Sequence, residues 1–298
     1  MPSIQKPFFW LLLLVVLLSA CSTQTATPTA VVTPSVTLSP TSTIPDEPTA
    51  TLVPAAAIVN GERISLAWLE EELHRYLIAQ EAMGEVDVDE AAARAIVLSD
   101  LIDQVLLAQG AREAGASISD VEVQSRLDAL AMDVDLEVWM MEWGYTREIL
   151  FELLKLQVLV AYQRDLIVDA IPEELDQIEV QQIFAFTEAG ADRALLRLNS
   201  GTAFEDVAFE FSPDTGGYLG WVPRGYLLIP AVEEAVFNQP VGTYTDVIES
   251  DIGYHIIRVI DRNVQPLSLD ARLTLQRQAL HQWLIDRRTE STIEVLVD

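Results

Sequence analysis

The sequence has little of what several large classes of protein require. One cysteine, Cys21, and three histidines occur among its 298 residues, so no intrachain disulfide is expected. The histidines lie too far apart in sequence to have the ligand spacing of a structural zinc site. Basic residues are scarce as well, with 18 Lys and Arg against 46 Asp and Glu and a formal net charge of −28. Because proteins hold nucleic acids mainly by neutralising phosphates with Lys and Arg, this balance excludes a nucleic-acid partner.

Motifs that carry common enzyme chemistry are missing too. The chain contains no glycine-rich phosphate loop, no Gly-x-Ser-x-Gly elbow and no His-Glu-x-x-His pair. The adjacent acids Glu233 and Glu234 fall on the face of a predicted helix, where we interpret them as solvated surface charge. We therefore expect neither a hydrolase nor a nucleotide-dependent enzyme, and no cofactor or metal.

The first 20 residues are predicted to be a secretory signal peptide. Lys6 supplies a short positive region, and residues 7–18 form an apolar run too short to cross a membrane comfortably. The string LSAC at 18–21 resembles a bacterial lipobox, in which the cysteine thiol takes a lipid before it becomes the new N-terminus. We expect an extracytoplasmic lipoprotein anchored to a membrane through Cys21. An uncleaved anchor with an incidental cysteine is the alternative.

Residues 21–55 are predicted to form a disordered linker. Positions 22–54 include ten Thr, six Pro and only two charged residues, which is too little apolar material to offset the entropy of folding. Repeated prolines favour an extended chain of about 3.1 Å per residue, so we expect a stalk between the membrane and a folded body. Thr/Pro-rich tracts of exported proteins are also sites of O-glycosylation, and the sequence leaves this open.

Apolar residues at helical spacing predict a helical domain over 56–170. A short strand and turn at 59–64 precede the first helix. The predicted helices begin after Ser65 and after Ser119 and cover 90–113 and 146–167. We expect their apolar stripes to bury one another in an all-α domain.

One stretch of this domain is rich in methionine and tryptophan. Such side chains are most often part of a core, but flexible methionines and flat aromatic rings also suit the binding of varied unfolded segments. Five residues are therefore candidates for chaperone contacts, with burial in the core as the alternative: Met132, Trp139, Met140, Met141 and Trp143.

The pattern changes over residues 172–262. Helices are predicted between strands, and the last two strands follow one another directly, which favours an antiparallel sheet over a doubly wound one. The predicted strands are 178–186, 218–222, 246–249 and 254–260, and the predicted helices are 189–199, 204–211 and 230–238. The expected fold class is α+β, with helices around a four-stranded antiparallel sheet.

Two sets of sequence strings resemble known families. In the helical domain, IVNGERIS, LSDLIDQVLLAQGAREAG, ISDVEVQSRL and YTREILFELLKLQVLVAYQ occur in the order of the N-terminal region of SurA- and PrsA-type foldases. Over 172–262, GTAFEDVAFEFSPD, GGYLGWVPRG, PAVEEAVFNQPVGTYTDVIES and GYHIIRVIDR resemble the parvulin (rotamase, PpiC) family of peptidyl-prolyl cis/trans isomerases. The second resemblance implies catalysed rotation about X-Pro peptide bonds.

Rotation about an X-Pro bond needs no nucleophile. The barrier in amides, about 18–20 kcal/mol, comes from resonance, and no bond is made or broken. An apolar socket for the proline ring, exclusion of water and a few placed hydrogen bonds suffice, because the twisted amide is less dipolar than the planar one. The pocket of the family is of this kind.

The resemblance assigns catalytic positions to three residues. His255, in GYHII, matches the second pocket histidine of the family, and Asp214 matches the position beside the isomerising carbonyl, where the family carries Cys or Asp. Gln182 stands where the first family histidine is expected, and it donates and accepts hydrogen bonds but carries no charge. Taken alone, His255 would be a core histidine on a strand and Asp214 a turn residue, and both alternatives stay open.

Substrate-binding positions follow from the same resemblance. Apolar side chains around the proline socket, or in the core beneath it, are expected at Leu219, at Leu227 or Leu228, and at Phe237. Val232 occupies the place of an expected aromatic residue. The smaller side chain implies a looser socket.

Residues 266–298 are predicted to form a final amphipathic helix. Its apolar stripe consists of Leu269, Leu273, Leu280 and Leu284. A lone amphipathic helix must bury its stripe, and in SurA- and PrsA-type proteins the corresponding segment packs on the N-terminal helices. The resemblance thus implies that the tail completes the helical domain. Binding of a basic helix face to a membrane surface is the alternative.

Together these features predict a membrane-anchored extracytoplasmic foldase that isomerises X-Pro bonds. Its expected partners are unfolded or proline-containing exported polypeptides, held near the isomerase by the helical domain. A non-catalytic chaperone, whose parvulin fold only binds peptide, is the alternative that Gln182 and Val232 favour. A lipoprotein module that reuses the fold to bind another ligand is a third hypothesis.

Overall fold

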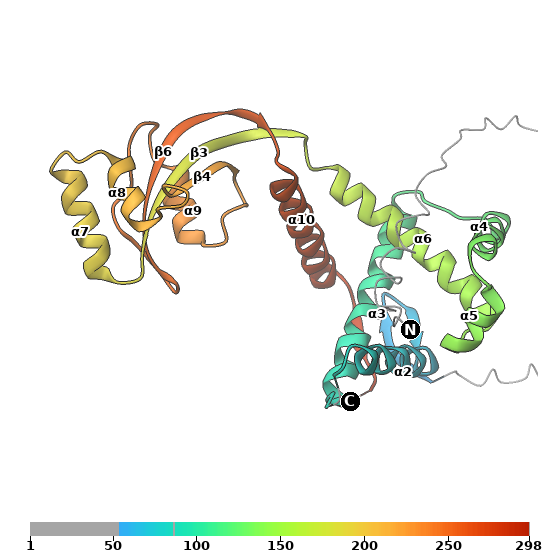
Figure 1. Cartoon of the computed structure of the whole chain (residues 1–298). Helices are drawn as coiled ribbons and strands as arrows, with labels where there is room; N and C mark the ends of the chain where they lie inside the picture. Colours follow the sequence, from blue (N-terminus) through green and yellow to red (C-terminus); the bar gives the residue numbers. More distant parts are fainter. Residues whose placement is uncertain (1–53, 86, 298) are drawn as a thin grey trace, which may run out of the picture. The chain divides into compact units, whose positions relative to one another are not determined.

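The computed structural model describes residues 54–85 and 87–297 (Figure 1). The predicted signal peptide, Cys21 and nearly all of the predicted linker 21–55 lie outside the described residues. Within the described part of the chain, no helix is both long enough and apolar enough to span a membrane.

The described chain falls into two compact units. One consists of residues 54–162 together with 287–297, and the other consists of 163–286. Two helices, α6 (Arg147–Asp169) and α10 (Leu269–Glu290), contribute residues to both units. The units are called the helical unit and the isomerase-like unit below.

A small antiparallel sheet, in the order β2-β1-β7, lies in the helical unit. Its strands are β1 (Ala55–Val59), β2 (Glu62–Ser65) and β7 (Ile293–Val295). Asn60 and Gly61 join β1 to β2 with φ angles of 50° and 86°, the left-handed conformation that a two-residue hairpin turn requires. The helical unit therefore contains a sheet that its description as all-α omits, and β7 was not predicted at all.

Five helices follow one another in the helical unit. They are α2 (Leu66–Ala82), α3 (Glu90–Glu113), α4 (Asp120–Asp133), α5 (Leu136–Trp143) and α6. The predicted caps are confirmed: the Ser65 hydroxyl accepts a hydrogen bond from the Trp68 amide (3.1 Å), and the Ser119 hydroxyl accepts one from the Glu122 amide (3.2 Å). Gly144 ends α5 in the left-handed conformation.

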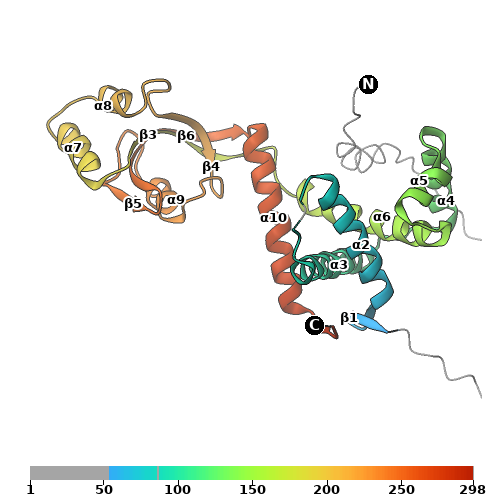
Figure 2. The ribbon, with the colours of Figure 1, turned by 60° about the horizontal axis from the view of Figure 1, so that its bottom comes forward.

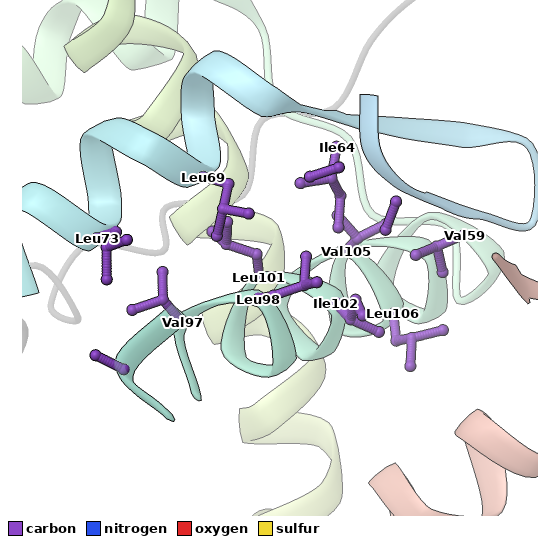
Figure 3. Close-up of a cluster of buried hydrophobic side chains, with 13 residues drawn as sticks. Val59, Ile64, Leu69, Leu73, Val97, Leu98, Leu101, Ile102, Val105 and Leu106 are labelled. Atoms are coloured by element: carbon purple, nitrogen blue, oxygen red, sulfur yellow. The ribbon is translucent and has the colours of Figure 1, made fainter. Parts of the chain in front are cut away.

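The main core of the helical unit lies between β1, β2, α2 and α3 (Figure 3). Its side chains are those at helical and strand spacing, including Val59, Ile64, Leu69, Leu73, Leu101, Val105 and Leu106. A second cluster joins α4, α5 and α6 through Leu127, Leu136, Met140 and Leu150. A third cluster joins α3 to α6 through Ala108, Ala111 and Leu159. The stripes predicted from the sequence thus bury one another in three separate clusters.

The end of α10 is attached to α3. Arg288 donates hydrogen bonds to the Asp103 carboxylate (2.6 Å) and to the carbonyl oxygen of Ser99 (2.9 Å). Beyond α10, the Asn60 side chain accepts a hydrogen bond from the Thr292 amide (2.9 Å) next to β7. The last residues of the chain are therefore part of the helical unit.

The isomerase-like unit contains a four-stranded antiparallel sheet in the order β4-β3-β6-β5. Its strands are β3 (Glu174–Ala185), β4 (Tyr218–Pro223), β5 (Ile248–Ser250) and β6 (Gly253–Pro266). The predicted α+β fold class is confirmed. The strands β3 and β6 are longer than predicted because they pair along their whole length, from Ala185 opposite Tyr254 to Glu174 opposite Pro266 (Figure 2).

Helices cover both faces of this sheet. On one face, α7 (Glu188–Asn199) and α8 (Phe204–Phe211) pack on Ile183 and Ile256. On the other, α9 (Pro230–Phe237) packs on a cluster that includes Ile178, Val180, Ile257 and Val259. Val222 of β4 belongs to the same cluster and Ile248 of β5 packs against it, so the cluster draws on all four strands.

The start of α10 packs within the isomerase-like unit. Ala271 and Leu275 are its buried residues, whereas Leu269 and Leu273 are exposed, so the predicted leucine stripe is wrong in this part. A Cβ added to Gly225 would lie 3.1 Å from the Leu275 side chain. The face of α10 that is buried is thus decided by the loop against which it packs.

Candidate active site

Two of the predicted catalytic residues lie on neighbouring strands of the same sheet face. His255 on β6 is opposite Phe184 on β3, and Gln182 is opposite Ile257. Because directly opposite residues of antiparallel strands point to the same side, these four side chains share one face. It is the face on which α9 packs: Ile257, opposite Gln182, belongs to the α9 cluster, and Ile248, opposite His255, packs against it.

His255 is buried, with 2% of its surface exposed. Its Nε2 lies 2.7 Å from the Ser250 hydroxyl oxygen, which itself donates to the carbonyl oxygen of Gly253 (3.0 Å). The tautomer that keeps this serine bond carries the imidazole proton on Nε2 and leaves Nδ1 as the acceptor. Nδ1 is buried and has no hydrogen-bond partner among the described residues. The ring therefore has one unpaired nitrogen.

Burial lowers the pKa of His255 below its usual value of 6.5. No carboxylate contributes to the shift, so desolvation of the charged form is its cause. The imidazole is consequently neutral near pH 7. A neutral ring among apolar neighbours suits an uncharged peptide bond better than an ionic ligand.

The loop that carries Asp214 is fixed against β3 beside Gln182. The backbone N–H of Gln182 donates a hydrogen bond to the carbonyl oxygen of Gly217 (2.7 Å). A Cβ on Gly217 would lie 1.9 Å from the backbone carbonyl oxygen of Gln182. Only glycine permits this approach, since Gly217 also has φ +72°. Asp214 itself is exposed, within a turn, so its predicted turn geometry and an accessible carboxylate occur together.

A polar network around the buried Gln181 side chain supports the same loop from the opposite face of the sheet. Gln181 Nε2 donates to the carbonyl oxygen of Gly216 (2.7 Å), and its Oε1 accepts from Arg258 (2.9 Å). Arg258 also forms an ion pair with Glu205 (2.7 Å), and this hydrogen bond lowers the pKa of the Glu205 carboxyl. The network was not predicted, because Gln181 sits beside a family motif position rather than in it.

The predicted substrate-binding residues separate into two groups. Val232 and Phe237 are buried in the α9 cluster, where they form the base beneath the face. Leu219 and Leu228 are exposed, and Leu227 is partly buried against the same cluster. Only the second group offers side-chain surface to a ligand in this structure.

Glu233 holds the loop that carries Leu227. Its carboxylate accepts hydrogen bonds from the amides of Gly225 (3.0 Å) and Leu227 (3.2 Å). The interpretation of Glu233 as solvated charge is wrong, whereas the neighbouring Glu234 is exposed as expected. The available signal was the position of Glu233 in the first turn of α9, just after a glycine loop. There, a carboxylate readily meets free backbone amides.

Ser250 was also missed. The hairpin between β5 and β6 places Ser250 opposite Gly253 and Ile248 opposite His255. The chain reversal thus brings the Ser250 hydroxyl onto the imidazole five residues later. A tight turn at Asp251–Gly253 was the signal that could have found it.

A separate cleft of about 790 Å³ lies in the helical unit. Trp68 of α2 and Ile149, Leu153 and Leu156 of α6 supply apolar lining. The rim has five glutamates against three basic residues. The cleft is therefore an apolar groove with an excess of negative charge.

The methionine- and tryptophan-rich stretch does not form one surface. Met132 and Met141 are exposed, but Met140 is buried, and Trp139 stacks on Tyr145 with ring centroids 5.2 Å apart. The structure therefore divides this set between core and surface. Across the described residues, no cluster of three or more potential metal ligands occurs.

Two domain families match the chain. Residues 170–263 match the PPIC-type PPIASE domain, and residues 29–132 match the SurA-like N-terminal domain. Chaperone SurA of Alcanivorax borkumensis is 32% identical over 124 residues, which cover 35% of this chain and 28% of that protein. Foldase protein PrsA of Halalkalibacterium halodurans is 32% identical over 131 residues, 42% of this chain and 37% of that protein. The chain thus spans about a third of the length of these two relatives.

Longer matches are more distant in sequence. Foldase protein PrsA of Caldanaerobacter subterraneus is 27% identical over 238 residues, 70% of this chain and 74% of that protein. Among solved structures, the peptidylprolyl isomerase PrsA from Bacillus anthracis gives a TM-score of 0.42 at 20% identity, covering 64% of this chain and 92% of that one.

Proposed function

The chain is a SurA- and PrsA-type protein with a PPIC-type PPIase domain, and on this premise we propose that it is an extracytoplasmic foldase that isomerises X-Pro bonds in exported polypeptides. The observation that carries the proposal is the arrangement around His255. A buried neutral imidazole and the Gln182 side chain share one sheet face, and the loop that carries Asp214 is hydrogen-bonded to the Gln182 backbone beside them.

The proposed chemistry uses these groups without forming a bond to the substrate. The planar X-Pro amide is stabilised by a resonance form with negative charge on its oxygen. A carboxylate beside that oxygen, from Asp214, disfavours the planar form. The side-chain NH₂ group of Gln182 donates a hydrogen bond to an acceptor on the substrate. Both effects favour the twisted transition state over the planar ground state.

The test is the cis-to-trans rate of a short X-Pro peptide with the full chain and with Asp214→Ala. We expect acceleration by the wild type and a loss of about tenfold in kcat/KM in the variant, equivalent to about 1.4 kcal/mol of transition-state stabilisation. Asp192→Ala on α7 is the matched control, since Asp192 is an exposed aspartate of the same unit. Equal rates for both variants would show that Asp214 has no role in catalysis. No acceleration by the wild type would show that the protein is not an isomerase.

A second candidate function is that of a chaperone that binds unfolded segments without catalysis. The apolar groove of the helical unit favours it, as does the absence of charge at Gln182. We expect the full chain to slow aggregation of an unfolded client, with Leu153→Asp in the groove reducing the effect and Asp214→Ala leaving it intact. Leu166→Asp is the control, because Leu166 is an exposed leucine of the same helix outside the groove.

The proposal retains the predicted organisation of the chain. It comprises a signal peptide at 1–20, a linker at 21–55, a helical domain at 56–170 completed by the end of the tail 266–298, and an isomerase domain at 172–262. Lipidation of Cys21 is part of it. Mass spectrometry of the N-terminal peptide from membranes tests this, with Cys21→Ala expected to release the protein from the membrane fraction.

A further inference from the structure

Two phenylalanines form an exposed aromatic step next to His255. The Phe184 ring lies 5.1 Å from the imidazole, and the Phe186 ring meets Phe184 edge-on, with centroids 4.9 Å apart and planes at 79°. Phe186 is 84% exposed. A ring that is so exposed adds little to the stability of the fold, although one side of it is held by Phe184.

The backbone places this step on the face of the candidate active site. Phe184 is opposite His255 and Ala185 is opposite Tyr254, so continuing the register puts Phe186 opposite Gly253. Alternation along β3 directs Gln182 and Phe184 to one side of the sheet, and the Phe186 ring contacts the Phe184 ring there. The aromatic step therefore extends the surface that begins at Gln182 and His255.

Gly253 makes room for the step. A Cβ at this position would lie 2.9 Å from two atoms of the Phe184 ring and 2.7 Å from the carbonyl oxygen of Ala185. Ile252, the residue before Gly253 in the turn, is exposed. The hairpin thus has no side chain at the position where the Phe184 ring lies.

We propose that Phe184 and Phe186 form a subsite for an aromatic or large apolar side chain next to the isomerised proline. The inference rests on the proposed function and names the substrate class that the site prefers. Apolar rings with exposed faces and edges bind a flat or bulky apolar group by burying area and by edge-to-face contact. A charged side chain at this place would lose hydration without gaining a partner, since His255 is neutral.

The test is a series of peptides that differ only in X of the X-Pro bond, with Phe, Leu, Ala and Lys at X. With the full chain, we expect kcat/KM for Phe-Pro to exceed that for Ala-Pro by about three- to tenfold, the range of an aromatic contact. Phe186→Ala should bring this ratio close to one by lowering kcat/KM for Phe-Pro, because the Phe side chain at X then loses its contact with the ring.

The matched control is Phe209→Ala, on α8. Phe209 is also an exposed phenylalanine of this unit, at 59%, and its loss should leave the Phe-Pro to Ala-Pro ratio as in the wild type. Phe184→Leu is the second variant, and it should lower the ratio by less than Phe186→Ala. An unchanged ratio in Phe186→Ala, or an equal fall in Phe209→Ala, overturns the subsite.

Binding of the same peptides separates this inference from the proposed function. Titration of the full chain with the Phe-Pro and Ala-Pro peptides gives their Kd values without any need for catalysis. A lower Kd for Phe-Pro than for Ala-Pro that Phe186→Ala abolishes supports the subsite even if no peptide is isomerised, and only the proposed isomerase activity is then rejected. Acceleration of all peptides without such a preference supports the isomerase activity and rejects the subsite.

Discussion

Buried polar side chains are distributed unequally between the two units. Among the described residues, the helical unit buries one such side chain, Arg75, whereas the isomerase-like unit buries five: Gln163, Gln177, Gln181, Thr245 and His255. The helical unit is held mainly by apolar packing, which is tolerant of small shifts. The isomerase-like unit adds directional contacts, which fix where its backbone lies.

The buried polar groups of the isomerase-like unit mostly bind backbone of another segment. Gln177 donates to the carbonyl oxygen of Gln265 (2.7 Å), and Thr245 accepts from the amide of Ile257 (3.1 Å). Gln181 does the same for the loop that carries Asp214. Leaving such groups unpaired costs more than their pairing contributes, so they specify geometry more than stability. A site that must hold loops in place benefits from this kind of support.

The largest expected effect on stability is in the apolar core of the helical unit. Leu106 of α3 is fully buried in the core that α3 forms with β1, β2 and α2. Leu106→Ala should lower the free energy of unfolding by about 2–5 kcal/mol through lost burial and a cavity. Urea denaturation measures it. Leu196→Ala, at an exposed position of α7, should change stability by less than about 0.5 kcal/mol. Similar losses in both variants would contradict the packing argument.

The next effect concerns the backbone approach at Gly217. Gly217→Ala adds a Cβ 1.9 Å from the carbonyl oxygen of Gln182 at φ +72°, which should cost about 1–3 kcal/mol of stability and displace the Asp214 loop. Isomerase rate and urea denaturation together measure both consequences.

Gly242→Ala is the matched control for Gly217→Ala. Gly242 also has a positive φ, +83°, but a Cβ there meets nothing within 4 Å. It should cost only the conformational strain, about 1–2 kcal/mol, and leave the isomerase rate unchanged. If the two variants have equal rates, the contact between Gly217 and Gln182 does not position the loop.

Arg75 is the exception in the helical unit, and its replacement sharpens the comparison. Its guanidinium lies 4.3 Å from the centre of the Tyr145 ring and donates to Glu72 (2.7 Å), while burial raises the pKa of Tyr145 to about 12. Arg75→Met keeps the length but removes the charge, and should cost about 1–2 kcal/mol in urea denaturation. Arg94→Met, which breaks the more exposed pair with Glu70, should cost less than about 1 kcal/mol.

The helices and caps were predictable from the sequence because they depend on local signals. Apolar spacing and the hydroxyls of Ser65 and Ser119 act within a few residues of one another. Strand β7 was missed because its three residues gain their hydrogen bonds from β1, more than 200 residues earlier. The prediction of the buried face of α10 was wrong for the same reason, because that face is determined by packing against a loop at Gly225, distant in sequence.

The candidate site was predictable only where residues belong to family strings. His255, Gln182 and Asp214 were named in this way, and the structure brings His255 and Gln182 onto one face. Glu233 and Ser250 were missed because their roles arise from chain reversals that bring a side chain to a backbone amide or to a ring. The spacing of apolar residues indicates which face of a strand or helix a residue occupies. It does not indicate which loop, distant in sequence, packs against that face.

The smallest expected effect is the dependence of stability on pH through His255. Because burial lowers its pKa below 6.5 in the folded state, the unfolded state binds more protons than the folded state as the pH falls through 6.5. Stability is then retained above about pH 6.5 and decreases below it. Unfolding free energies between pH 7.5 and 5.5 should fall less steeply in His255→Gln than in the wild type. His281→Gln, which removes an exposed histidine, should keep the wild-type slope. Equal slopes in all three proteins would mean that burial does not shift the pKa of the imidazole, and the argument that desolvation keeps His255 neutral would then fail.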